Sequence, residues 1–264
     1  MKKVRVKNEK IDQQENMLRI RQMTKIFFPG TSNEKIALNR IDLDLKKGEF
    51  VTVLGTNGSG KSSLFNAICG TFELDDGIII LDNQDITWEK DHKRALHISR
   101  IFQDPQLGTA PDLTIAENLA LAYTRKASPS LFPLNKKDYR FFRDKLKLLG
   151  MDLELRMDTK IGLLSGGQRQ AVSLVMEIIS QPKLLLLDEH TAALDPQTSE
   201  RILDVTNQFV RESGVTTMMI THNIKDALKN GDRTIVFNDG KIIHDYRGAE
   251  RDELDPHDLQ ALYG

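Results

Sequence analysis

Residues 55–63 have the sequence GTNGSGKSS and lie between the apolar stretch FVTVL at 50–54 and SSLFNAI at 62–68. The spacing matches G-x-x-x-x-G-K-[S/T], in which glycines let the backbone curl around phosphate groups. A strand before this loop and a helix after it are the context that the motif requires. A chance glycine turn would not need both flanks, so the segment predicts a phosphate-binding loop.

The residues of this phosphate loop have different expected tasks. Lys61 would reach the β and γ phosphates of ATP, and the hydroxyl of Ser62 would hold Mg²⁺. Free backbone N–H groups would surround the phosphates. The predicted ATP-binding residues in the loop are Gly55, Thr56, Asn57, Gly58, Ser59, Gly60, Lys61, Ser62 and Ser63.

The pattern of the chain changes twice outside the loop. Residues 17–54 alternate apolar and polar side chains, which predicts a half-exposed antiparallel sheet. From about 107 to 180 the pattern is helical, and after 180 strands alternate with helices, as in a parallel sheet with crossover helices. We therefore predict an α/β fold: a P-loop NTPase (RecA-like) core with an antiparallel β subdomain and an inserted α-helical subdomain.

A second glycine-rich helix start occurs in LLSGGQRQA, residues 163–171. Unpaired N–H groups and the positive end of the helix dipole make such a start favourable for phosphate. The chain therefore has two predicted phosphate-binding segments, which raises the question of why one protein needs both.

Two adjacent carboxylates, Asp188 and Glu189, end the apolar run in KLLLLDEH at 183–190. Ligands bind at the carboxyl ends of strands in parallel sheets. Asp188 is predicted to take Mg²⁺, usually through water, and Glu189 to activate the attacking water as a general base. A solvated turn would explain the pair equally well if it stood alone, but the phosphate loop upstream favours the catalytic interpretation.

Two further polar side chains follow predicted strands. Gln103, in IFQDP, could contact Mg²⁺ or the attacking water, and His222, in MMITHN, could contact the γ-phosphate. Taken alone, each is more often an ordinary surface glutamine or a capping or buried histidine. Both are included in the predicted catalytic set because of the motifs that accompany them.

The composition excludes several classes of protein. The 264 residues include 37 basic and 38 acidic side chains, a balance that provides no global field for nucleic acid. The single cysteine, Cys69, excludes an internal disulfide and fits a reducing compartment. No apolar run approaches the ~20 residues of a membrane helix. Residues 1–16 lack the apolar segment of a signal peptide, so we expect a mobile tail there and a folded domain over 17–264.

Six motifs occur in one order along the chain: the phosphate loop, Gln103, LSGGQ at 164–168, LLLLDE at 184–189, AALD at 192–195 and His222. This order resembles the ATP-binding subunit of an ABC transporter, and the resemblance spans residues 17 to about 246. The family usually has proline after the catalytic glutamate, where this chain has His190. DEHTAALDP and FFPGTSNEKIAL are similar to a subgroup of bacterial importer ATPases linked to uptake of aromatic amino acids such as tryptophan.

The resemblance implies a head-to-tail homodimer, which explains the two phosphate-binding segments. Each ATP would lie between the phosphate loop of one subunit and the signature segment of the other. That segment is Leu164, Ser165, Gly166, Gly167 and Gln168. Asp195 would lie in the loop that crosses the interface, and Phe27, or the adjacent Phe28, would stack on adenine. Ser62, Gln103 and Asp188 are the implied contacts of Mg²⁺.

The same resemblance implies the peripheral ATPase of a bacterial importer, at the cytoplasmic face of the cell membrane. Separate integral membrane permease subunits would bind it, and an extracytoplasmic solute-binding protein would act indirectly. We expect LGTAPDLTIAENL, residues 107–119, to contact the permease; a plain linker is the alternative. The alternative function from another class is a soluble ABC ATPase in assembly work, such as iron–sulfur cluster biogenesis.

Overall fold

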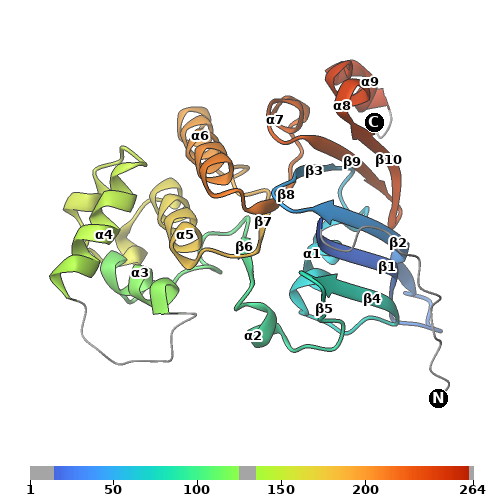
Figure 1. The fold of residues 1–264 in the computed structure, drawn as a ribbon, viewed down its shortest axis with the longest axis horizontal. Helices are drawn as coiled ribbons and strands as arrows, with labels where there is room; N and C mark the ends of the chain where they lie inside the picture. The colour runs from blue at the N-terminus through green and yellow to red at the C-terminus, as the bar shows by residue number, and fades with distance from the viewer. Residues whose placement is uncertain (1–14, 125–134, 262–264) are drawn as a thin grey trace.

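The computed structural model describes residues 15–124 and 135–261. A six-stranded sheet has the strand order β10-β9-β3-β8-β7-β6 (Figure 1). The strands from β9 to β6 run parallel, and β10 is antiparallel to β9. Their bounds are β3 Phe50–Leu54, β6 Ile98–Ile101, β7 Leu184–Asp188, β8 Thr216–Ile220, β9 Arg233–Asn238 and β10 Lys241–Arg247.

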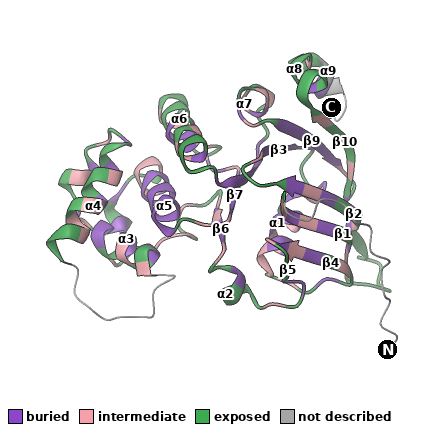
Figure 2. Cartoon of the chain, viewed as in Figure 1, coloured by how far each residue is buried: buried purple, intermediate pink, exposed green. Residues whose placement is uncertain are grey.

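The central strands β3, β7 and β8 are buried along their whole length (Figure 2). Successive side chains of a strand point to opposite faces, so both faces must be covered. Leu185 and Leu187 of β7 join one apolar core, and Leu184 and Leu186 join another. This explains the unbroken run LLLL, which is typical of a parallel strand covered on both sides.

A second sheet, with the order β2-β1-β4-β5, is antiparallel. Its strands are β1 Asn16–Phe27, β2 Lys35–Lys46, β4 Asp76–Leu81 and β5 Gln84–Asp85. Leu18, Ile20 and Met23 of β1 are fully buried and share the core of helix α1. The apolar–polar alternation predicted this arrangement, with one face of the sheet packed and the other exposed.

The helices that position the site follow or join these strands. Helix α1 (Lys61–Cys69) begins in the phosphate loop and ends at Gly70, whose φ is +77°. The other helices are α2 Asp91–Arg94, α3 Ile115–Thr124, α4 Lys136–Lys147, α5 Gly166–Ser180, α6 Pro196–Ser213, α7 Ile224–Lys229, α8 Gly248–Asp252 and α9 Pro256–Ala261. Short 3₁₀ turns occupy Leu153–Leu155 and Ile161–Leu163.

The helices α3, α4 and α5 form the block that is inserted between β6 and β7 (Figure 1). The predicted α/β class, with an antiparallel sheet and an inserted helical subdomain, is confirmed. Helix α5 is buried along most of its length, and its apolar residues share one core with the sheet residues Leu185 and Leu187. The boundary at 107–180 remains a prediction, because α5 packs on both the sheet and the other helices.

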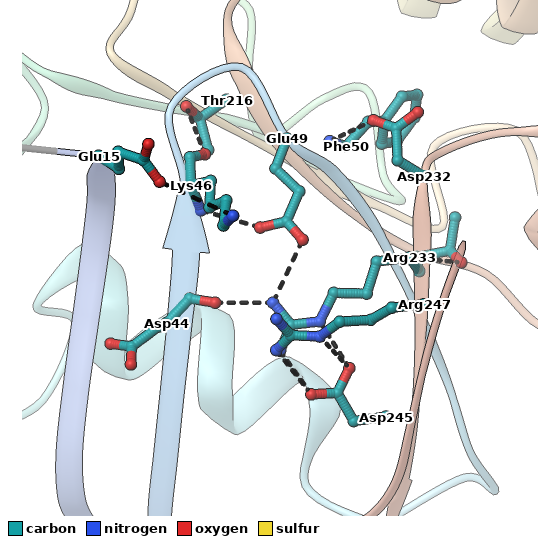
Figure 3. Close-up of polar contacts among 11 residues, drawn as sticks. Glu15, Asp44, Lys46, Glu49, Phe50, Thr216, Asp232, Arg233, Asp245 and Arg247 are labelled. Carbon is teal, nitrogen blue, oxygen red and sulfur yellow. Dashed lines mark hydrogen bonds and ion pairs between the residues drawn. The ribbon is translucent and has the colours of Figure 1, made fainter. Parts of the chain in front are cut away.

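A buried arginine on β9 ties the two sheets together (Figure 3). Arg233 is 2% exposed and donates two hydrogen bonds to the carboxylate of Asp245 on β10, at 2.6 and 2.7 Å. It also donates to the carbonyl of Asp44 on β2 at 2.7 Å. Burial alone would raise the pKa of Asp245, but the hydrogen bonds from Arg233 and Arg247 outweigh it and lower the value to about 2. The strands on both sides of the phosphate loop are thus held by charge-assisted bonds.

None of the described helices has the length and apolar character that crossing a bilayer requires. Residues 1–14 of the predicted N-terminal tail lie outside the described residues. Glu15 accepts a hydrogen bond from the backbone N–H of Lys47 at 2.8 Å, and Asn16 begins β1.

Candidate functional site

The phosphate loop is packed so tightly that two of its glycines have no room for a side chain. Gly55 has a φ of +150° and Gly60 a φ of +112°. A Cβ atom on Gly55 would lie 2.2 Å from the carbonyl oxygen of Phe237, and one on Gly60 would lie 2.5 Å from that of Ala37. The loop is therefore held between β9 and β2, and glycine is required by contacts within the chain itself.

Lys61 begins α1 and turns its ammonium group toward the loop that precedes it. Its Nζ donates to the carbonyls of Gly55 and Thr56, both at 2.8 Å. The side chain is buried, and this desolvation lowers the pKa of Lys61, opposed by the charges of Glu189 and Asp188. A cation and two carboxylates from distant parts of the sequence thus lie within electrostatic reach of one another.

Glu189, the predicted general base, and His222, the predicted contact of the γ-phosphate, follow neighbouring strands and are in contact. Glu189 follows β7, and its backbone N–H donates to the carbonyl of Ile220, in β8, at 3.0 Å. Nε2 of His222 lies 2.5 Å from Oε1 of Glu189. Glu189 also has a φ of +46°, a left-handed conformation that is uncommon for residues with a Cβ atom and is often found at functional sites. The carboxylate–imidazole pair is suited to orient or deprotonate a water molecule.

One pocket joins most of the predicted nucleotide-binding residues. Its lining includes Phe27, Asn57, Gly58, Gly60, Lys61, Ser62, Ser63 and Glu189. Phe27 is partly exposed and packs edge-on against Phe72, with ring centroids 5.4 Å apart. The predicted aromatic contact for adenine is therefore placed beside the phosphate loop, whereas no residue of the signature segment lines this pocket.

Lys35 is a residue of this pocket that the sequence analysis missed. It begins β2, and its Nζ would lie 3.7 Å from a Cβ atom on Gly58. A second cation beside the phosphate loop suits a polyanionic ligand. No motif marks Lys35 in the sequence, because a lysine after a loop is usually an ordinary surface residue.

Oxygen donors for a divalent cation come from Ser62 in α1 and Asp188 at the end of β7. Hydroxyl and carboxylate oxygens suit Mg²⁺, which proteins usually hold with one or two carboxylates together with substrate phosphates. Among the described residues, no group of three or more His, Cys, Asp or Glu could hold a metal ion unaided. The donors present fit an Mg²⁺ ion that binds together with a nucleotide.

Gln103, the third predicted contact of Mg²⁺, follows β6 and is exposed. It is not part of the pocket that contains Lys61 and Glu189. The structure therefore leaves its role toward metal or water as a prediction.

Arg100, on β6, is a charged residue at the site that the sequence analysis did not find. Its guanidinium donates to Oδ2 of Asp188 at 2.5 Å and to Oδ1 of Asn66 at 2.5 Å. Its side chain is 11% exposed and that of Asp188 10%. The available signal was a charged side chain inside the short, otherwise mainly apolar strand ISRI.

His190, which follows Glu189, the predicted general base, is buried. Its side chain is 3% exposed, and its Nε2 has no hydrogen-bond partner among the described residues. Burial lowers the pKa of His190 to about 4, because a charged imidazolium would be poorly solvated there. His190 is therefore a neutral side chain near pH 7.

The signature segment starts α5 with a capping box. Ser165 accepts from the backbone N–H of Gln168 at 3.2 Å, and the Gln168 side chain accepts from the backbone N–H of Ser165 at 3.2 Å. Gly166 is exposed, and a Cβ atom there would have no neighbour within 4 Å among the described residues. A Cβ atom on Gly167 would lie 2.9 Å from Cγ2 of Thr198 in α6. Leu164, the first residue of the segment, is buried.

Asp195 caps the helix that packs against the signature segment. Its side chain accepts from the backbone N–H of Thr198 at 3.0 Å. The pKa of Asp195 is lowered, first by the side chain of Thr198 and then by this backbone N–H. Asp195 is exposed and does not line the pocket of Lys61. Within one chain, then, the signature segment and Asp195 are apart from the phosphate loop.

A groove is present on another side of the site, between α1, α2 and α5. Its lining includes Asn66, Cys69, His92, Arg94, Arg100, Leu107 and Glu177, and we call it the Leu107 groove. Leu107 is 68% exposed, although it is a large apolar residue. Leu113, in the same predicted contact segment, is half-buried and is not part of this lining.

The comparisons with known proteins agree with this geometry. The family model described as ABC transporter matches residues 38–192. A tyrosine transport ATP-binding protein of Clostridioides difficile (strain R20291) is 41% identical over 238 residues, which are 90% of this chain and 95% of that protein. The energy-coupling factor transporter ATP-binding protein EcfA2 of Clostridium perfringens (strain 13 / Type A) is 33% identical over 235 residues, covering 88% of this chain and 80% of that protein.

Solved structures show the same fold. A dimeric ATP-binding cassette in a post-hydrolysis state, bound to ADP and Pi, superposes with a TM-score of 0.76 at 29% identity, covering 88% of this chain and 98% of that chain. The ADP conformation of another ATP-binding cassette of an ABC transporter gives a TM-score of 0.75 at 28% identity, covering 94% and 98%. The phosphate loop, the Glu189–His222 pair and these likenesses lead to one conclusion: the chain belongs to the ABC transporter family, as an ATP-binding subunit that hydrolyses ATP.

Proposed function

We propose that this chain is the ATPase subunit of a bacterial ABC importer whose solute is an aromatic amino acid. The observation that carries the catalytic part is the pocket that contains both Lys61 and Glu189, with His222 in contact with Glu189. Support for the solute comes from the 41% identical relative, named for tyrosine transport, and from the DEHTAALDP segment. The solute would never touch this subunit.

Each residue of the pocket has a proposed task. The N–H groups of residues 55–63 and the Lys61 ammonium bind the β and γ phosphates, and Phe27 stacks on adenine. Ser62 and Asp188 hold Mg²⁺, with Gln103 reaching it from the end of β6. When bound, Mg²⁺ would neutralise charge that develops on the phosphate oxygens. Glu189 takes the proton of the attacking water, and His222 holds the Glu189 carboxylate and contacts the γ-phosphate.

A second subunit would complete the site. Ser165, Gly166 and Gly167 lie outside the pocket of their own chain, and Gly166 faces open space. A phosphate could approach the helix start closely because glycine there leaves the N–H groups uncovered. We propose a head-to-tail homodimer in which Leu164–Gln168 of one subunit cover the ATP held by the other, with Asp195 at the interface. The relative solved with ADP and Pi is itself dimeric.

The membrane partner would be an integral permease that binds the Leu107 groove, with the ATPase at the cytoplasmic face of the membrane. An exposed leucine in a groove with mixed charges is suited to a short protein helix. An extracytoplasmic solute-binding protein would deliver the solute to the permease and would contact the ATPase only indirectly. No nucleic acid partner is proposed.

Dimerisation is the direct test of this proposal. The Glu189→Gln variant should elute from size exclusion at twice the monomer mass with ATP and Mg²⁺, and mostly as a monomer without ATP. ATP stabilises the closed state because it binds both subunits at once. A monomer at every ATP concentration up to physiological levels would contradict the dimer.

The importer part needs a second experiment. The tagged chain should be recovered from native membranes together with a polytopic permease, identified by mass spectrometry. Recovery with soluble assembly factors and without a permease would favour a different class of ABC ATPase. ATP hydrolysis by the purified chain would remain in either case.

A further inference from the structure

Arg100 connects the two elements that carry the proposed ligands of Mg²⁺. One guanidinium nitrogen donates to Asp188 at the end of β7, and another donates to Asn66 in α1, both at 2.5 Å. Asn66 lies four residues after Ser62 in the same helix, so these two residues share one helix face. Arg100 therefore links the helix that carries Ser62 to the end of β7, which carries Asp188.

The Arg100 side chain is itself held from several sides. Its Cζ lies 4.8 Å from the ring centroid of Phe102 and 6.0 Å from that of Phe65. The side chain is 11% exposed, and its Nε has no hydrogen-bond partner in the described part of the chain. A guanidinium packed in this way has little freedom to follow a moving partner, and it imposes its planar geometry on the groups that it binds.

Asp188 accepts from Arg100 through Oδ2, and no described residue donates to its Oδ1. A single bound oxygen orients a carboxylate and leaves the other oxygen for a metal ion or its water. Hydrogen-bond partners of metal-binding carboxylates commonly have this role. The metal concerned is demanding, since Mg²⁺ requires nearly ideal octahedral geometry, whereas Ca²⁺ accepts longer and more variable bonds.

We propose that Arg100 is a positioning residue that sets the spacing and orientation of Ser62 and Asp188 for Mg²⁺, and thereby makes the site selective for Mg²⁺ over Ca²⁺. This inference rests on the proposed function, in which both residues hold the metal of a bound nucleotide. Arg100 touches neither nucleotide nor metal in this assignment; it acts through Asp188 and Asn66.

If Arg100 acted only through its charge, its removal would change the affinity for Mg²⁺ in the opposite direction. A positive charge beside a cation site weakens binding of any divalent ion, so its removal should tighten Mg²⁺ and Ca²⁺ alike. Loss of a geometric constraint should instead weaken Mg²⁺ and affect Ca²⁺ much less. The ratio of the two affinities therefore separates positioning from charge, and also from a general loss of stability.

The test uses the full-length Glu189→Gln chain, in which hydrolysis should be slow, and a fluorescent ATP analogue. Its affinity is measured in EDTA and during titration with MgCl₂ or CaCl₂. In this background, Arg100→Met should raise the half-saturating Mg²⁺ concentration about 10-fold, the low end of the effect expected for such partners, and change that of Ca²⁺ much less. Arg100→Lys keeps the charge without the planar fork, so it should lose the same Mg²⁺ preference.

Two further variants serve as a control and as a second test. Arg21→Met removes an arginine that is paired with Asp44 at 2.7 and 2.8 Å on the exposed face of β1, and it should leave both titrations unchanged. Asn66→Ala breaks the bond to α1 and should shift the Mg²⁺ titration in the same direction as Arg100→Met. If Arg100→Met does not fold, Arg100→Lys and Asn66→Ala decide the question.

An unchanged or lower Mg²⁺ requirement in the folded Arg100 variants, or an equal shift for Mg²⁺ and Ca²⁺, overturns the inference. Asp188→Asn separates this failure from that of the proposed function. If Asp188→Asn abolishes the gain in affinity from Mg²⁺ and the Arg100 variants do not alter it, the inference alone is wrong. If Asp188→Asn has no effect, the proposed metal site is wrong, and the role of Arg100 with it.

Discussion

The phosphate loop and the signature segment are both glycine-containing helix starts, yet Gly55 and Gly60 of the first and Gly166 of the second are present for different reasons. At Gly55 and Gly60 a Cβ atom would lie within 2.5 Å of backbone oxygens of the same chain. At Gly166 it would meet nothing within 4 Å. The fold therefore requires the first two glycines, whereas nothing in the described part of the chain requires the third.

This difference indicates how an incomplete site can be recognised in one subunit. A glycine that its own chain does not need, at the open end of a helix, indicates a requirement that comes from outside the chain. Lys61 and Glu189 share a pocket with the phosphate loop, while the signature segment contributes nothing to that pocket. The comparison thus supports a site that two subunits share, and the variants of Gly55 and Gly166 test it directly.

The largest effect is expected for Glu189→Gln. This variant should still bind ATP through both phosphate-binding segments, but it should hydrolyse ATP much more slowly. Turnover should fall by roughly 10²–10⁴, the range for loss of a general base, while ATP binding is retained. Steady-state phosphate release and equilibrium binding of a fluorescent ATP analogue measure the two quantities. Near-normal turnover would show that Glu189 is not the base.

The next largest effect is a difference in stability between glycine variants of the two segments. Gly55→Ala should lower the free energy of unfolding by at least 1–3 kcal/mol, roughly the cost of overpacking, because backbone must move. Gly166→Ala should leave it unchanged or slightly raised, because alanine favours a helix more than glycine. Denaturant unfolding of both variants measures the contrast.

Gly166→Ala should nevertheless weaken the ATP-dependent dimer when it is combined with Glu189→Gln, since the new methyl group covers the helix start. The matched control is Glu189→Gln alone under the same conditions. A normal dimer in the double variant, or instability of Gly166→Ala equal to that of Gly55→Ala, would break the contrast between the segments.

His190 lies in the segment of residues 189–195 that links Glu189 to α6, the helix that packs against Gly167. Its pKa is about 4 in the fold, below the ordinary value of 6.5. The unfolded chain therefore binds more protons between pH 6.5 and 4, and stability is lost as the pH falls through this window. The contribution of His190 should be about 2 kcal/mol lower at pH 5 than at pH 8.

Urea unfolding of the wild type and His190→Phe at both pH values isolates this contribution. Phenylalanine does not titrate, so the variant should lose less stability on acidification than the wild type. Equal losses in the two proteins would mean that His190 is hydrated in the fold.

The smallest effect on the stability and ATP hydrolysis of the isolated subunit is expected for a residue outside the phosphate loop and the signature segment. Leu107→Glu alters an exposed side chain of the groove and should change stability by no more than about 0.5 kcal/mol, with ATP hydrolysis retained. Association with the permease should weaken, because the carboxylate would be buried without a partner. Co-purification from membranes measures this association.

Leu113→Glu sharpens the same prediction, since Leu113 is half-buried and outside the groove. It should reduce stability more than Leu107→Glu and affect the permease contact less. If Leu107→Glu abolishes hydrolysis or folding, the segment around it belongs to the core and not to a docking surface.

Features that depend on a few consecutive residues could be predicted from the sequence. The glycine spacing of the phosphate loop, the apolar run before Asp188 and Glu189, the helix start at LSGGQ and the change from alternating to helical pattern are all local features of the sequence. From these, the α/β class, the antiparallel sheet and the inserted helices could be predicted. The shared core of α5 and the sheet could not, because periodicity shows that a face is apolar and not what covers it.

The tertiary structure alone decided which distant residues meet and which surfaces remain open. It brought His222 to Glu189, Arg100 to Asp188 and Asn66, and Lys35 to the phosphate loop. It also showed that Gly55 is enclosed, that Gly166 is open and that Leu107, unlike Leu113, lines a groove. These relations depend on contacts between segments far apart in the chain, and the interaction of two such segments leaves no local pattern in either of them.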